Sequence, residues 1–155
     1  MIRDYHRALC LYSFEYRGTE KRPGLIFGLD KSGICRGMAF RVAETYSAET
    51  VAYLWEREMV PHVYLPRWLN GKLADGWQAL VLAFVKDTNH EQYAGRLDDE
   101  TAIKNVLQGK GKKGRCLEYL QNTLDHLDEM GIHNTTLTSI VQRAEHGIDR
   151  QGQQK

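Results

Sequence analysis

The sequence has 155 residues, 42% hydrophobic and 26% charged, an ordinary balance for one folded domain. Its formal charge of +1 gives no electrostatic reason to expect nucleic acid or an anionic membrane as a partner. The longest apolar run, residues 79–85, is too short to cross a bilayer, and residues 1–7 lack the apolar core of a signal peptide. These features predict a cytoplasmic protein. The oligomeric state stays open, with a monomer as the expectation.

The cysteines and histidines give no sign of a metal site. Cys10, Cys35 and Cys116 are an odd number at wide spacing, which fits neither a disulfide framework nor a zinc motif. The six histidines show no ligand spacing. The sequence therefore predicts reduced, buried thiols and no metal.

The first third of the chain is typical of β-structure. Residues 5–13 are rich in β-formers, and residues 24–30 predict a second strand that turns at residues 30–33. Residues 34–42 predict a third strand. Glycines inside these strands favour a curved or barrel-like sheet.

The middle of the chain predicts a helix followed by two strands. Ser47 offers an N-cap for a helix that reaches Met59, with Pro61 preventing its continuation. Residues 63–69 predict an edge strand, because Pro66 has no N–H to donate. Residues 78–86 are almost continuously apolar, which favours a buried strand.

The last third of the chain is helical by pattern. Asp98 or Asp99 caps a helix ending near Gln108, a second helix follows Gly114 and ends near Met130, and Asn134 caps a third over residues 135–146. Residues 151–155 predict a disordered tail. Strands first and helices last indicate an α+β fold, with one domain over residues 1–150.

Glu58 stands out on the helix from Ser47. It continues the i, i+3, i+4, i+7 stripe of Val51, Leu54 and Trp55, which should face the core. One interpretation is a carboxylate at a frayed helix end that reaches solvent or pairs with an arginine. The other is a partly desolvated carboxylate suited to moving protons near neutral pH.

Several stretches, in order along the chain, resemble one enzyme family, the ChaC-type γ-glutamylcyclotransferases. They are Tyr16-Arg17-Gly18-Thr19 with Pro23-Gly24, Gly28-Leu29-Asp30, Cys35-Arg36-Gly37-Met38-Ala39-Phe40-Arg41-Val42, Tyr53-Leu54-Trp55-Glu56-Arg57-Glu58-Met59, Tyr64-Leu65-Pro66-Arg67-Trp68, Gln92-Tyr93-Ala94-Gly95 and Gly114-Arg115-Cys116-Leu117-Glu118-Tyr119-Leu120. The resemblance implies the fold of that family, a curved mixed β-sheet or small barrel with flanking helices.

The resemblance also implies a reaction, the cleavage of glutathione to 5-oxoproline and Cys-Gly. The α-amine of the γ-glutamyl group attacks its own γ-carbonyl, so the enzyme mainly has to fold the substrate and transfer protons. The family's catalytic glutamate, which follows an arginine, falls on Glu58. No cofactor is implied. The alternatives are a cyclotransferase for other γ-glutamyl amides and a non-catalytic regulatory module.

The resemblance implies four further site residues. Arg17 matches a family arginine near the substrate pocket, and a guanidinium suits a carboxylate of glutathione. Ser13 matches another pocket-side position, and Tyr93 and Tyr119 match tyrosines that could donate hydroxyls to the substrate.

One family feature has no counterpart in this sequence. ChaC-type proteins open with a strand carrying Tyr-Gly-Ser-Leu, whose loop holds the γ-glutamyl head through backbone N–H groups. That motif is absent, and the match begins at the family's second strand. The expectation is a sequence shortened at its N-terminus, with a reduced, inactive relative as the alternative.

Overall fold

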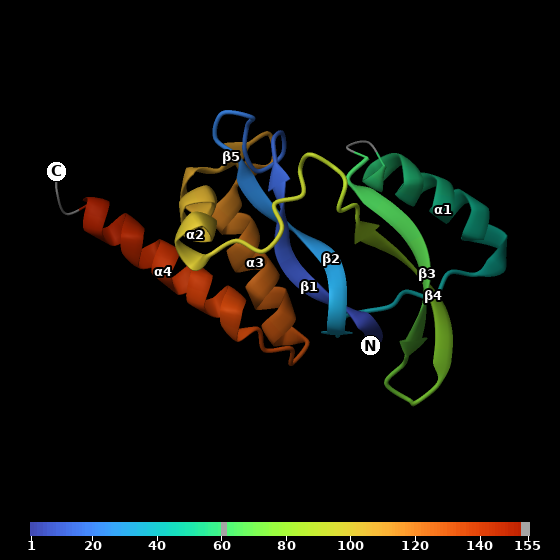
Figure 1. Ribbon diagram of the computed structural model, residues 1–155. Coiled ribbons are helices and arrows are strands. Elements are labelled where there is room, and N and C mark those ends of the chain that lie inside the picture. The colour runs from blue at the N-terminus through green and yellow to red at the C-terminus, as the bar shows by residue number, and fades with distance from the viewer. Residues whose placement is uncertain (60–61, 153–155) are drawn as a thin grey trace. The chain divides into compact units, whose positions relative to one another are not determined.

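The computed structural model describes residues 1–59 and 62–152, and the side chains up to residue 147. In chain order the elements are β1 (Ile2–Ser13), β2 (Gly24–Cys35), α1 (Glu44–Glu58), β3 (Tyr64–Lys72), β4 (Gln78–Lys86), α2 (Asp99–Gln108), β5 (Lys110–Gly111), β6 (Gly114–Arg115), α3 (Cys116–Glu129) and α4 (Thr135–Gly152) (Figure 1). Strands dominate the first part and helices the last, so the predicted α+β class is confirmed.

The main sheet has the strand order β2-β1-β3-β4. β3 and β4 pair antiparallel along their whole length, from Tyr64 opposite Lys86 to Lys72 opposite Gln78. β1 and β3 meet at one pair, Ile2 opposite Gly71. The short strands β5 and β6 form a separate antiparallel hairpin.

The chain divides into two compact units. Unit 1 consists of Met1–Ala8 and Phe27–Tyr93, and unit 2 consists of Leu9–Ile26 and the described residues from Ala94 onward. Each unit is described by itself. The prediction of one domain over residues 1–150 stays a prediction.

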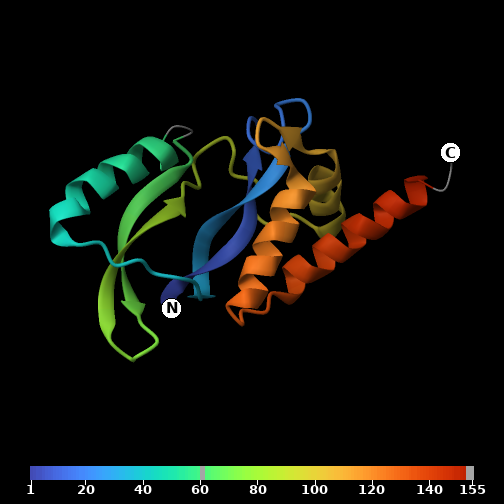
Figure 2. The ribbon, with the colours of Figure 1, turned by 180° about the vertical axis from the view of Figure 1, so that it is seen from behind.

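Unit 2 is built around three helices, α2, α3 and α4, which pack against one another (Figure 2). Leu120 and Leu127 of α3 are buried, as are Val106 of α2 and Val141 of α4. The Asp98 carboxylate accepts a hydrogen bond from the Thr101 N–H at the start of α2. At the start of α4 the Asn134 side chain accepts one from the Leu137 N–H. Both predicted caps are therefore confirmed.

Unit 1 contains β3, β4 and α1. β4 has the predicted bounds, but most of its residues are only half-buried. β3 was expected at a sheet edge, and the strand order places it between β1 and β4. Pro66 is compatible with this order, because β1 pairs with β3 at Gly71, away from Pro66, and Pro66 lies opposite Phe84 of β4.

The predicted third strand is wrong. β2 continues through residues 30–33 to Cys35, because Ser32 and Gly33 adopt positive φ angles of 84° and 75° and distort the strand locally without reversing it. Residues 36–43, which lead into α1, have no regular structure (Figure 1).

Two helix boundaries also differ from the prediction. α1 begins at Glu44, and Ser47 donates its hydroxyl to the Glu44 carbonyl and so does not cap the helix. Pro61 lies outside the described residues. α4 reaches Gly152 and takes in the first two residues of the predicted tail, whose remainder is not described. Among the described helices, none is both long and apolar enough to span a bilayer.

Candidate active site

The loop between β1 and β2 carries the first predicted residues. Ser13 ends β1 and is buried, and its Oγ accepts a hydrogen bond from the Arg17 N–H at 3.0 Å. Thr19 and Arg22 exchange two backbone hydrogen bonds of 3.1 Å across the turn that follows. These bonds fix the backbone on both sides of Arg17.

Glycines let the rest of unit 2 approach this loop closely. A Cβ added at Gly18, Gly24, Gly109 or Gly111 would lie within 3.0 Å of backbone atoms. At Gly24 and Gly109 the nearest such atom is the Arg17 carbonyl oxygen. The hairpin adds two backbone hydrogen bonds of 2.9 Å, from Lys112 to the Glu15 carbonyl and from Lys113 to the Tyr16 carbonyl. The loop is therefore held against α2 and the β5–β6 hairpin by direct backbone contact.

The Arg17 guanidinium is held in place by a backbone carbonyl and an aromatic ring. Nη1 donates to the Lys113 carbonyl, and the guanidinium carbon lies 5.0 Å from the centre of the Tyr119 ring. Nε and Nη2 have no hydrogen-bond partner among the described residues. Ser13, Arg17 and Tyr119 are thus brought together in unit 2, with two guanidinium nitrogens left for a ligand.

Glu58 is the last residue of α1, in unit 1. Its side chain is 31% exposed, and Oε1 lies 3.5 Å from Nε of Arg57. The prediction that its stripe faces the core is wrong for this structure, because α1 has no buried residue and Val51 and Trp55 are exposed. Within unit 1, neither β3 nor β4 packs closely enough against α1 to bury this stripe.

Tyr93, also in unit 1, belongs to a cluster that the sequence analysis missed. Lys86 Nζ lies 2.9 Å from Asp30 Oδ1 and 3.6 Å from the centre of the Tyr93 ring. The Tyr93 hydroxyl donates to Asp30 Oδ2 at 3.3 Å. The signal in the sequence was Lys86 at the end of an apolar strand. A lysine in such a position is buried only when an acidic partner lies beside it, so the sequence implied a partner for Lys86.

The pKa values of the pair follow from these contacts. Burial disfavours the charge on Asp30, but hydrogen bonds from Lys86 and the Lys31 N–H outweigh it and hold the pKa of Asp30 below its usual range. Burial also opposes the charge on Lys86, yet the hydrogen bonds with Asp30 and Tyr93 raise the pKa of that ammonium above its ordinary value. Both groups are charged at neutral pH.

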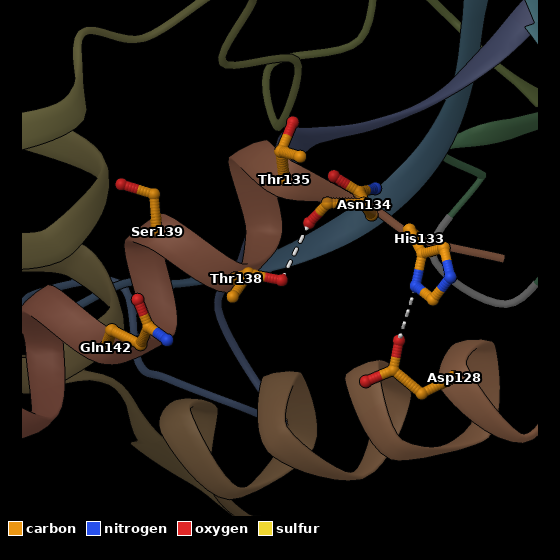
Figure 3. Close-up of a pocket in the computed structure, with 7 residues that line it drawn as sticks. All are labelled: Asp128, His133, Asn134, Thr135, Thr138, Ser139 and Gln142. Atoms are coloured by element: carbon orange, nitrogen blue, oxygen red, sulfur yellow. Dashed lines mark hydrogen bonds and ion pairs between the residues drawn. The ribbon is translucent and has the colours of Figure 1, made fainter.

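Two surface hollows lie in unit 2, away from the predicted residues. One of about 380 Å³ lies at the turn between α3 and α4, where His133 Nδ1 lies 3.6 Å from Asp128 Oδ1 (Figure 3). The other, about 540 Å³, lies beside α2 and α4 and includes Arg22 and Arg143. Within the described residues, no three His, Cys, Asp or Glu side chains are grouped to hold a metal ion.

Comparison with known proteins gives a consistent result. The family model described as ChaC-like protein matches residues 1–146. A glutathione-specific γ-glutamylcyclotransferase of Escherichia coli K12 is 28% identical over 137 residues, covering 88% of this chain and 59% of the relative. A rat protein, glutathione-specific γ-glutamylcyclotransferase 1, is 28% identical over 84% of this chain and 60% of its own length. The chain thus spans about three fifths of the length of these relatives.

A solved structure confirms the fold. The crystal structure of a yeast γ-glutamylcyclotransferase specific to glutathione superimposes with a TM-score of 0.72 at 16% identity, over 94% of this chain and 87% of the yeast chain. At that identity the likeness bears on the fold alone, and it agrees with the predicted γ-glutamylcyclotransferase-like class.

Proposed function

The chain belongs to the ChaC-like protein family, and from this premise we propose that it is a γ-glutamylcyclotransferase that cleaves glutathione to 5-oxoproline and Cys-Gly. The observation that carries the proposal is the family match over residues 1–146, which includes both Arg17 and Glu58. The relatives from Escherichia coli and rat, which bear this activity in their names, support the choice of substrate.

In the proposed reaction the enzyme transfers protons and neither adds nor removes atoms. The α-amine of the γ-glutamyl group forms a bond to its own γ-carbonyl carbon, and the bond from that carbon to the cysteine nitrogen breaks. The α-ammonium loses two protons, one before the attack and one as the lactam N–H forms. The departing amide nitrogen gains two, one as the C–N bond breaks and one as Cys-Gly becomes an ammonium. Because attack is intramolecular, the main demand on the protein is to hold the substrate folded. No cofactor is needed, and we assign the enzyme to the cytoplasm.

Glu58 is the proposed acid and base. A carboxylate can take the proton from the α-ammonium and return one to the leaving nitrogen. Its position at the end of α1, with the side chain about one third exposed, leaves the carboxylate accessible to a small substrate.

Arg17 is the proposed anchor for a carboxylate of glutathione. Nη1 is occupied by the Lys113 carbonyl, so Nε and Nη2 are the atoms offered to the ligand. Ser13 and Tyr119 support this role by fixing the loop backbone and the plane of the guanidinium. Tyr93 of unit 1 is a further proposed substrate-binding residue. Its hydroxyl, which donates to Asp30 in this structure, would exchange that partner for the substrate.

The test is direct assay of the purified chain with reduced glutathione, following 5-oxoproline and Cys-Gly. Glu58→Gln keeps the size of the side chain and removes its basicity, so release should fall more than about 100-fold. Glu56→Gln, an exposed neighbour on the same helix, is the matched control and should keep wild-type activity. A folded wild-type chain that releases no 5-oxoproline would overturn the proposal.

Two further measurements address substrate recognition. Arg17→Met should raise KM for glutathione about tenfold or more, while Arg22→Met, in the same loop, should leave KM unchanged. A panel of other γ-glutamyl amides tests the substrate class, and turnover of these in preference to glutathione would replace the proposed substrate.

A further inference from the structure

Lys86 is a buried cation outside the proton transfers of the proposed reaction. Its side chain is 3% exposed, and a lysine is rarely buried to this degree because removing an ammonium from water is costly. Lys86 ends β4, and its partner Asp30 lies in β2, although these strands stand at opposite ends of the order β2-β1-β3-β4. The ion pair therefore joins two strands that are not neighbours in the sheet.

Tyr93 is the third member of this cluster, and it lies outside the helices and strands, between β4 and α2. Its N–H donates to the His90 carbonyl at 2.9 Å, which fixes the main chain but not the half-buried side chain. Lys86 Nζ lies over the ring, 3.6 Å from its centre, and the hydroxyl donates to Asp30 Oδ2 at 3.3 Å. The two charged groups thus hold the tyrosine at different places, Lys86 at the ring face and Asp30 at the hydroxyl.

The two contacts differ in whether a bound substrate would break them. The bond from the Tyr93 hydroxyl to Asp30 is longer than the usual O–H···O distance of about 2.7–2.8 Å, so little is lost when the hydroxyl leaves. Asp30 then keeps two partners at Oδ1, Lys86 Nζ at 2.9 Å and the Lys31 N–H at 2.6 Å. The contact of Lys86 with the ring face does not involve the hydroxyl, and it therefore persists whichever acceptor the hydroxyl faces.

We propose that Lys86 is a positioning residue, whose ammonium holds the Tyr93 ring in one orientation so that the hydroxyl can pass from Asp30 to the substrate while the ring stays in place. This inference rests on the proposed function, because it assigns Tyr93 a contact with glutathione. Lys86 acts through Tyr93, since its own side chain is almost fully covered. A hydroxyl that is already aimed loses less side-chain freedom on binding, so the gain lies in substrate affinity.

A purely structural role for Lys86 predicts a different result. The pair with Asp30 would then stabilise the sheet, and its loss would lower the free energy of unfolding without changing how folded molecules bind glutathione. A positioning role predicts a change in KM that depends on the Tyr93 hydroxyl, because the orientation of the ring matters only while the ring carries that hydroxyl. Tyr93→Phe removes the hydroxyl and keeps the ring. Combining the two changes therefore separates the two roles.

The experiment measures KM and kcat for glutathione in the full chain, at a temperature where circular dichroism shows each variant folded. Lys86→Met should raise KM about fivefold or more and leave kcat within about twofold. In the Tyr93→Phe background the same change should raise KM less than about twofold. Val85→Ala, at the buried neighbouring position of β4, is the matched control and should lower stability but leave KM unchanged. An equal rise in KM with and without the Tyr93 hydroxyl, or no rise at all, overturns the proposal.

A second variant, Lys86→Met combined with Asp30→Asn, serves if the single variant unfolds, because it leaves no charge unpaired in the cluster. It keeps an acceptor for the Tyr93 hydroxyl and removes the cation from the ring face, so KM should rise as in Lys86→Met. An unchanged KM here also overturns the proposal. A folded wild-type chain that releases no 5-oxoproline rejects the proposed function and this inference with it, whereas normal cleavage with an unchanged KM in the Lys86 variants rejects the positioning role alone.

Discussion

The two units differ in how completely they bury their apolar side chains. Of the 16 buried hydrophobic residues in the described chain, 13 belong to unit 2 and three to unit 1. Unit 2 has three mutually packed helices and a loop held by glycine contacts. Unit 1 has a 15-residue helix with no buried residue.

The difference shows that membership of a family does not by itself say which part of a chain has a well-packed core of its own. The proposed carboxylate anchor lies in the well-packed unit, where Arg17 is fixed on both sides. The proposed acid and base lies at the end of α1, the least packed helix. We therefore expect mutations to cost stability mainly in unit 2, whereas changes in unit 1 should alter activity.

The largest stability effect is expected at the glycine contacts of unit 2. Gly18→Ala places a Cβ against the backbone of Gly24 and Ser13, and neither can move without displacing the loop. We expect a loss of more than about 4 kcal/mol in the free energy of unfolding, measured by urea denaturation. Gly37→Ala in unit 1 is the control, because a Cβ there would lie 3.6 Å from its nearest neighbour, Nη2 of Arg7, which is an ordinary contact distance. Equal effects at both positions would contradict the comparison.

The next effect contrasts two leucines. Leu120 is fully buried in α3, and Leu120→Ala should cost about 3 kcal/mol through lost transfer energy and a cavity. Leu80→Ala removes a largely exposed side chain and should cost about 0.5 kcal/mol or less in the free energy of unfolding. A large loss at Leu80 would mean that unit 1 packs better than described.

The Lys86–Asp30 pair is the exception that sharpens the comparison, because it is a buried charge inside unit 1. Lys86→Met should lower the free energy of unfolding by about 2 kcal/mol, because it leaves the mostly buried Asp30 carboxylate without its cation. The loss is smaller than for a fully buried pair, because the Asp30 side chain is 23% exposed. Lys86→Met combined with Asp30→Asn should recover part of the loss. An additive double variant would argue against coupling.

The same pair sets a pH window for that stability. The pKa of Asp30 is lowered from 3.8, so its contribution is present above about pH 4 and is lost as pH falls through the folded-state value. The pKa of Lys86 is raised from 10.5, so its contribution is present below that pH and is lost as pH rises through the folded-state value. The difference between wild type and Lys86→Met should be flat between these limits and shrink outside them.

The smallest expected loss of stability distinguishes the start of α4, which has a side-chain cap, from the start of α1, which has none. Asn134→Ala removes the side-chain acceptor for the Leu137 N–H and should cost about 1 kcal/mol in thermal or urea unfolding. Ser47→Ala in α1 should cost far less, because Ser47 lies inside the first turn and does not cap the helix. A comparable loss at Ser47 would restore it as a cap and move the start of α1.

The predictable parts of the fold are those with strong local signals. Asp98 and Asn134 cap their helices as expected, and the apolar run of β4 has the predicted ends. The turn expected at residues 30–33 failed because the chain can absorb a positive φ at Ser32 and Gly33 as a distortion of one strand. Local composition does not distinguish the two outcomes.

The candidate site residues came from resemblance more than from pattern, and their roles stay predictions. Arg17 and Tyr119 are far apart in sequence, and the structure brings the guanidinium over the ring; that both bind the substrate stays a prediction. Glu58 was singled out by a helical stripe that the structure leaves uncovered. The Lys86–Asp30–Tyr93 cluster needed three distant segments to meet, which no single window of sequence reveals.

Cys116 gives the fold a chemical property of its own. Its Sγ accepts the Leu25 N–H and donates to the Leu25 carbonyl, and burial raises the pKa of the thiol to about 11. At pH 7 only about one molecule in ten thousand carries the thiolate, which is the form that attacks disulfides. The contact between Cys116 at the start of α3 and Leu25 of β2 is therefore inert to thiol–disulfide exchange. It should keep its geometry while the ratio of reduced to oxidised thiols around the protein falls.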